Sequence, residues 1–160
     1  FGPAFGVEGG RETLNYWGNS FRLGYNLTGI IGSSWYRGCF QFVGEMFIAE
    51  IFESGGDGGA SIVVGPNALF RYNFIQENCP VVPYLQLGPG LVYTDTENNA
   101  IGSNYCFQLN IGAGLRYMIN DKWAISGEFD WHHMSNAGFA KHNAGSNSAG
   151  GQIGISHFFF

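Results

Sequence analysis

Residues 105–118 read YCFQLNIGAGLRYM and alternate between two kinds of side chain. The odd positions are apolar with a tyrosine at each end, and the even positions are small or polar apart from the last. Successive side chains of a β-strand point to opposite faces, so this pattern indicates a strand with one apolar and one polar face. The segment is predicted to be an amphipathic strand, long enough to cross a bilayer at a tilt.

The same alternation recurs along the chain and predicts about eight strands. Residues 21–28, 39–53 and 60–74 place aromatic and aliphatic side chains on one face and Arg, Asn, Gln or Glu on the other. Further strand-like runs occupy residues 4–12, 82–96, 122–135 and 149–160, with turn-rich joints at 53–59, 77–80, 96–104, 119–121 and 140–151. Because the sequence has neither helical periodicity nor linkers, residues 1–160 are predicted to form a single β-barrel domain.

Composition restricts the classes of function. Charged residues make up 12% of the chain, about half the share usual in soluble domains, and aromatic residues make up 17%. The chain has no apolar run long enough for a membrane-spanning helix. A net charge of −5 without a basic stripe argues against nucleic-acid binding. The three cysteines, Cys39, Cys79 and Cys106, lack metal-type spacing and are expected to be unlinked.

Two architectures fit eight amphipathic antiparallel strands: a soluble lipocalin-like barrel with an apolar interior, and a transmembrane barrel with an apolar exterior. The strands are long, and aromatic residues cluster near their ends, where a membrane girdle would lie. The polar face carries residues that would form an interior network: Arg22, Arg71, Arg116, Glu45, Glu128 and Asp130. The last strand ends in Phe, which resembles the C-terminal signal of bacterial outer-membrane barrels. We therefore predict an all-β fold, an eight-stranded antiparallel transmembrane β-barrel of the outer-membrane type.

Residues 131–147, WHHMSNAGFAKHNAGSN, follow the alternating segment WAISGEFD. In a single strand over 122–135, Trp131, His133 and Ser135 fall on the apolar, lipid-facing side, and the neighbouring histidine joins the acidic interior. A serine two residues after a histidine on one strand face allows the nucleophile–base pair of serine hydrolases. The alternative is a pair of polar residues at the level of the lipid headgroups.

The segment His133-Met134-Ser135-Asn136-Ala137-Gly138, followed by Asn143, Gly145 and Asn147, resembles the signature of the lipid A 3-O-deacylases. The members of that family are eight-stranded outer-membrane barrels, related in activity to acyloxyacyl hydrolases, with the active site on the outer wall. The resemblance implies that Ser135 is the nucleophile and His133 the general base. It also implies that the oxyanion and the substrate are bound by Asn136, Ala137, Gly138 and Asn143.

One position departs from the family pattern. Where the family has a glutamate that orients the histidine, this chain has Asn147. Asparagine can orient a catalytic histidine but cannot stabilise the imidazolium by charge. Glu128 and Asp130 lie on the opposite face of the strand, so neither would replace the glutamate, and His142 is expected to be a surface residue. The chain is expected to be a carboxylic ester hydrolase; the alternative is an inactive family member that serves as a structural or anchoring barrel.

The resemblance also implies partners and a location. The substrate would be lipid A, lipopolysaccharide or another glycolipid, met in the membrane, and either a homodimer or a larger membrane complex fits a protein of this kind. No cofactor and no metal are expected. The chain starts at Phe1 without a basic or apolar leader. We therefore expect a mature chain in the bacterial outer membrane after removal of a signal peptide.

Overall fold

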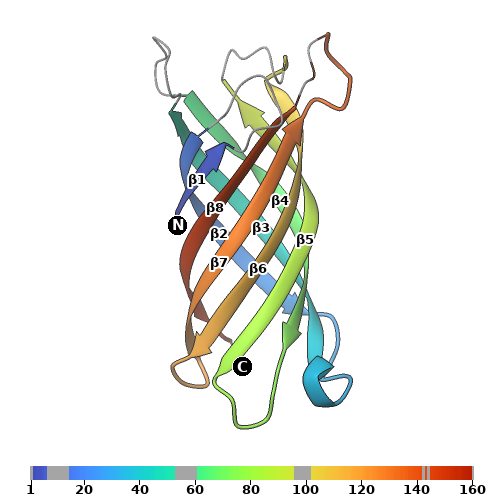
Figure 1. Cartoon of the computed structure of the whole chain (residues 1–160), viewed down its shortest axis with the longest axis vertical. Coiled ribbons are helices and arrows are strands. Elements are labelled where there is room, and N and C mark those ends of the chain that lie inside the picture. The colour runs from blue at the N-terminus through green and yellow to red at the C-terminus, as the bar shows by residue number, and fades with distance from the viewer. Residues whose placement is uncertain are drawn as a thin grey trace.

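A computed structural model of the chain shows a closed antiparallel β-barrel (Figure 1). The structure describes residues 2–6, 15–52, 61–95, 102–141, 143 and 145–159. Within them the strands are β1 (Gly2–Gly6), β2 (Asn15–Asn26), β3 (Gly38–Phe52), β4 (Ser61–Phe74), β5 (Val81–Thr94), β6 (Tyr105–Met118), β7 (Trp123–Ser135) and β8 (Ser146–His157), with a short 3-10 helix η1 (Ser34–Tyr36). None of the helical structure in these ranges is long and apolar enough to cross a membrane.

The predicted closure is confirmed, because the last strand pairs with the first. Ala4 of β1 lies opposite Gly150 of β8 in an antiparallel pair. All the remaining pairs of neighbouring strands are antiparallel as well. The prediction was less accurate at the two ends of the chain. In the described residues the first strand covers Gly2–Gly6, so it begins two residues before the predicted run 4–12. Residues 7–12 of that predicted run lie outside the described ranges.

β8 begins at Ser146, inside the segment predicted to be a turn. Its first residues are small and polar on both faces, so the apolar–polar contrast that marks the other strands is missing there. β2 also begins earlier than predicted, at Asn15 rather than at residue 21. Neither difference changes the number of strands or their order.

The two faces of β6 point as predicted. Its odd positions, including Phe107 and Leu109, are exposed on the outer wall, whereas Gln108, Asn110 and Arg116 are buried in the lumen. The same division holds for β3 and β4, and the exposed aromatic and aliphatic side chains form a wall suited to lipid. An apolar exterior around a polar interior excludes the lipocalin-like arrangement.

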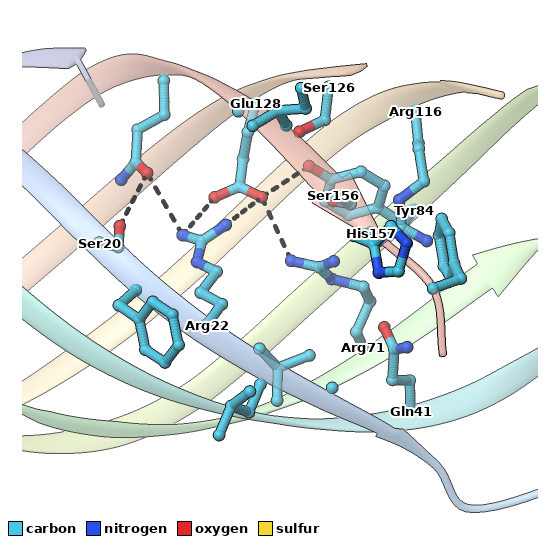
Figure 2. A pocket seen from close by; sticks show the side chains of 18 of the residues that line it. Ser20, Arg22, Gln41, Arg71, Tyr84, Arg116, Ser126, Glu128, Ser156 and His157 are labelled. Atoms are coloured by element: carbon cyan, nitrogen blue, oxygen red, sulfur yellow. Dashed lines mark hydrogen bonds and ion pairs between the residues drawn. The ribbon is translucent and has the colours of Figure 1, made fainter. Parts of the chain in front are cut away.

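The lumen is filled in two layers. At the end of the barrel where β7 ends, a cluster of apolar side chains packs together: Tyr16, Phe47, Ala49, Ile51, Val63, Val92, Cys106 and Met134. Below it lies the predicted polar network (Figure 2), in which the Arg22 guanidinium contacts Glu45 and donates to Glu128 at 2.8 Å. The Tyr84 hydroxyl donates to Glu128 at 2.7 Å, and Arg71 donates to Gln86 at 2.6 Å. These contacts join strands that are distant in the sequence and hold the barrel in one register.

Candidate active site

The candidate site lies where β7 ends at one rim of the barrel, at the upper end in Figure 1. Inward-facing His132, Met134 and Asn136 are all buried. They fix the parity of the strand end, so His133 and Ser135 between them face the outer wall, where each is half-buried. The packing of the lumen therefore orients the two polar residues toward the membrane side.

His133 is held by its neighbour on β8. The two strands pair His133 with Asn147, and Nδ1 of His133 lies 2.8 Å from Oδ1 of Asn147. Because an amide oxygen only accepts, the ring proton lies on Nδ1 and the lone pair on Nε2. This is the tautomer that a general base needs.

Two further residues confine the imidazole. The Trp131 ring is nearly parallel to it, with ring centroids 6.0 Å apart and an interplanar angle of 14°. Gly145 lies against the Cε1 edge of the ring, since a Cβ on Gly145 would fall 2.9 Å from Cε1 of His133. Gly145 also has a φ of 74°, a conformation that favours glycine. The sequence analysis assigned no role to either residue, although Trp131 stands two positions before His133, a spacing that places both on one strand face.

Ser135 is the last residue of β7 and lies opposite Phe107 of β6. Across the described residues its hydroxyl makes no hydrogen bond, with His133 or with any other group. Same-face neighbours on a strand are about 7 Å apart along the chain, so the contact with His133 requires the two side chains to lean toward each other. Catalytic hydrogen bonds are often long without substrate and tighten in the complex.

The turn after Ser135 is built around a buried asparagine. The Asn136 side chain is 1% exposed, and its Oδ1 accepts a hydrogen bond from the Gly138 N–H at 2.8 Å. The Asn136 N–H donates to Oδ1 of Asn143 at 2.9 Å. Among the residues expected to bind the oxyanion, the N–H groups of Asn136 and Gly138 are thus already bonded. In the described part of the chain, the Ala137 N–H has no acceptor.

Apolar side chains surround the polar group on the lipid side. Phe107 and Leu109 of β6 are exposed next to it, and the Phe107 ring lies 6.1 Å, centroid to centroid, from that of Phe139. Phe139 itself is 84% exposed. An acyl chain that approached from the membrane would therefore meet aromatic and aliphatic surface beside Ser135.

Several other expectations concern residues away from this group. Glu128 and Asp130 are buried in the lumen, so neither carboxylate reaches His133, as predicted. His142 lies outside the described residues. Within those residues no three His, Cys, Asp or Glu side chains are placed to hold a metal ion, and Cys39, Cys79 and Cys106 are free thiols.

The fold is that of an outer-membrane barrel, and the outward-facing serine, histidine and asparagine give it a candidate hydrolase site. The family model of the lipid A 3-O-deacylases (PagL) matches residues 13–156. The chain therefore belongs to the lipid A 3-O-deacylase (PagL) family, a family of outer-membrane barrels.

Comparison with known structures gives the same fold. A solved structure described as "Crystal structure of the outer membrane enzyme PagL" superposes with a TM-score of 0.70 at 21% sequence identity, covering 98% of each chain. A search of curated protein sequences found no match. Membership in this family of outer-membrane barrels places the chain in the outer membrane.

Proposed function

We propose that the protein is a serine esterase of the outer membrane that removes an ester-linked acyl chain from lipid A or a related glycolipid. The observation that carries this proposal is the 2.8 Å contact between His133 Nδ1 and Asn147 Oδ1 on the lipid-facing wall, two residues from Ser135. It leaves the basic nitrogen of His133 available on the same face as a serine hydroxyl. Membership in the deacylase family supports the choice of substrate class.

The reaction would proceed as an acyl transfer through Ser135. Nε2 of His133 takes the Ser135 hydroxyl proton while Oγ attacks the ester carbonyl carbon, giving a tetrahedral intermediate. Its collapse breaks the bond to the sugar oxygen, which receives the proton from His133 and leaves as an alcohol. Water, deprotonated by His133, then hydrolyses the acyl-serine and releases a fatty acid.

The oxyanion of the intermediate needs donors close to Ser135. Within the described residues, the Ala137 N–H of this turn has no acceptor and could donate to the oxyanion. The Gly138 N–H could become a second donor if it gave up its hydrogen bond to Asn136. Asn136 and Asn143 would act by holding the turn, with Asn143 next to the substrate. Removing one such donor typically costs about 3–4 kcal/mol of transition-state stabilisation.

Asn147 would position His133 without adding charge. Its Oδ1 keeps the proton on Nδ1, and so maintains the required tautomer. A carboxylate at that position would also stabilise the imidazolium that forms during the reaction. The proposed enzyme therefore has the orienting function of the third residue but not the electrostatic one, and a slow reaction is expected.

The placement of the site in the barrel fits a substrate of the outer leaflet. Bacterial barrels have short turns on the periplasmic side and longer loops outside. Residues 75–80 and 119–122 form short connections at the end where β8 finishes, opposite to Ser135 (Figure 1). The third connection at that end, residues 27–37 with η1, is longer. The site would then face the leaflet that holds lipopolysaccharide, with Phe107, Leu109 and Phe139 against the acyl chain.

A catalytically inactive barrel, acting as an anchor alone, as a homodimer or in a larger membrane complex, is the second candidate. The absence of a carboxylate beside His133 among the described residues favours it. The two candidates are separated by incubating the purified protein with lipopolysaccharide and weighing the lipid A by mass spectrometry. An esterase yields lipid A lighter by one acyl chain and a free fatty acid, and Ser135→Ala yields neither. A wild-type protein that leaves every tested glycolipid unchanged supports the anchor.

A further inference from the structure

The connection between β2 and β3 differs from the two other connections at the end of the barrel where β8 finishes. Residues 27–36, here called the aromatic loop, read LTGIIGSSWY and carry no charged side chain, whereas residues 75–80 and 119–122 each include at least one. The large side chains of the aromatic loop are all exposed: Leu27, Ile30, Ile31, Trp35 and Tyr36. An exposed apolar surface of this kind marks contact with a membrane or with another protein.

The aromatic loop has a defined backbone conformation. Ile31 and Gly38 exchange two backbone hydrogen bonds, of 2.8 and 2.9 Å. Gly32 has a φ of 75°, and it lies so close to Tyr36 that a Cβ on it would fall 2.5 Å from that ring. The loop therefore holds its apolar side chains in exposed positions while its backbone is bonded to the start of β3.

Contacts with β4 and the residues after it hold the aromatic loop at the side of the barrel. Tyr72 points outward from β4, and its hydroxyl donates to the Tyr36 carbonyl. Nε2 of Gln76 donates to the Trp35 carbonyl at 3.4 Å. In Figure 1, η1 accordingly lies next to the start of β3, at the side of the barrel.

The aromatic loop continues an aromatic row of the lipid-facing wall. On that wall the Tyr72 ring lies 4.8 Å from the ring of Phe40 and 4.9 Å from the ring of Phe74, centroid to centroid. Tyr36, bonded to Tyr72, and Trp35, whose ring lies 5.6 Å from that of Tyr36, extend the row beyond the strands. The surface that borders lipid on β3 and β4 is therefore continuous with the exposed surface of the loop.

We propose that the aromatic loop lies in the interfacial region of the bilayer, with Ile30, Ile31 and Trp35 in contact with lipid of the leaflet at this end of the barrel. Tryptophan and tyrosine favour that region because each joins an apolar ring to a polar group. The loop has no charge that would oppose burial at this depth. A protein partner would have to displace lipid from a row that continues the wall, so lipid is the favoured occupant.

This contact acts on the barrel as a whole. The loop extends the apolar surface on the side of β3 and β4, whereas the candidate site lies at the end of β7, across the eight-stranded barrel. Interfacial aromatic residues help to set the tilt of a membrane-spanning structure. The aromatic loop thus contributes to the position of the barrel in the membrane, and this role does not depend on the proposed esterase activity.

Tryptophan fluorescence in vesicles tests the proposal. In the full chain Trp17, Trp123 and Trp131 are replaced by Phe, so that Trp35 is the remaining tryptophan. The folded barrel is placed in phosphatidylcholine vesicles with or without bromine atoms on the acyl chains. We expect Trp35 to emit at shorter wavelength than in urea-unfolded protein, and brominated chains to quench most of that emission. Emission at the wavelength of the unfolded protein that brominated lipid leaves unquenched overturns the proposal.

Trp35→Phe in the otherwise unchanged protein gives a second measurement. Trp35 is 76% exposed and phenylalanine keeps an aromatic ring, so this variant should fold even if the triple variant does not. Brominated lipid should remove more emission from the wild type than from Trp35→Phe, and the difference should have the short-wavelength spectrum. Equal losses in the two proteins overturn the proposal.

A tryptophan in a charged connection is the matched control. Asp121→Trp places it in residues 119–122, in a chain whose native tryptophans are all replaced by Phe. We expect this tryptophan to be quenched clearly less than Trp35, because the charged connection should lie in water. Equal quenching at the two positions would show that the aromatic loop lies no deeper than a charged turn, and would contradict the proposal.

Discussion

His133 has three neighbours that restrict its imidazole: Asn147 at Nδ1, Trp131 along the ring face and Gly145 at Cε1. The proposed chemistry depends on this confinement, because a base must present one nitrogen to a hydroxyl on the same strand face. Small changes around the ring should therefore alter the rate of acyl release more than they alter the stability of the barrel.

Substitution of Asn147 tests the neutral partner. Asn147→Ala removes the acceptor at Nδ1, so the imidazole loses its tautomer and its orientation, and acyl release should slow. Asn147→Glu adds charge stabilisation of the imidazolium and should raise the rate; the relevant scale is about 10⁴-fold when a triad carboxylate is replaced by its amide. The measurement is fatty-acid release from lipopolysaccharide. An Asn147→Ala variant that works at the wild-type rate would contradict the positioning role.

Gly145→Ala tests the confinement at Cε1. The new Cβ would lie 2.9 Å from that atom on a backbone with a φ of 74°, so His133 must shift away from Asn147. Displacement of a catalytic group by about 1 Å can cost about 100-fold in rate. Gly127→Ala on the outer face of the same strand is the control, since a Cβ there meets nothing within 4 Å. If both variants release fatty acid at the same rate, Gly145 has no part in positioning His133.

The end of β7 and the turn after it form the element that places the site. Asn136 is buried and bonded to two backbone or side-chain partners, Gly138 and Asn143. Asn136→Ala removes the side-chain acceptor of the Gly138 N–H but keeps the backbone N–H that donates to Asn143. It should lower the stability by about 1–3 kcal/mol, together with the rate of acyl release. Urea unfolding in detergent and fatty-acid release measure the two effects. Asn143→Ala removes only the bond to the Asn136 N–H, and an equal loss of stability in the two variants would argue against the central place of Asn136.

How far these elements could be predicted depends on the contrast between their two faces. β6 and β7 alternate clearly, so their bounds and the outward direction of His133 and Ser135 followed from a period of two. The start of β8 at Ser146 could not be predicted from this period, because small polar residues occupy both faces of the strand there. The bond between Asn136 and Asn143 depends on backbone geometry across a turn, which residue types alone do not determine.

At the scale of the whole molecule, one carboxylate connects much of the barrel. Glu128 of β7 accepts hydrogen bonds from Arg22 of β2 and Tyr84 of β5, and lies 3.5 Å from Arg71 of β4. The sequence indicates that these residues face the lumen, but the choice of partners depends on barrel closure, which brings residues 106 positions apart into contact. The network and the outward site lie on opposite faces of β7, so stability and chemistry should be separable.

Glu128→Gln tests that separation. Loss of the charge removes the carboxylate beside the buried Arg71 and one of the two carboxylate partners of the part-buried Arg22, and should destabilise the barrel by about 3–5 kcal/mol. Glu77→Gln is the control, since Glu77 is exposed and its pair with Arg37 at 3.5 Å should contribute about 0–1 kcal/mol. Urea unfolding measures stability, and acyl release below the unfolding range should stay near the wild-type rate. A stable Glu128→Gln barrel would show that the network does not hold the fold.

The most direct test of the central claim, that His133 activates Ser135 on the outer wall, is labelling with a fluorophosphonate. We expect mass spectrometry of the labelled peptide to find one phosphonyl group on Ser135 in the wild-type protein. Ser135→Ala should carry no label, and His133→Ala should react far more slowly while the barrel stays folded. A wild-type protein that remains unlabelled, or a His133→Ala variant labelled at the same rate, would contradict the proposed nucleophile–base pair.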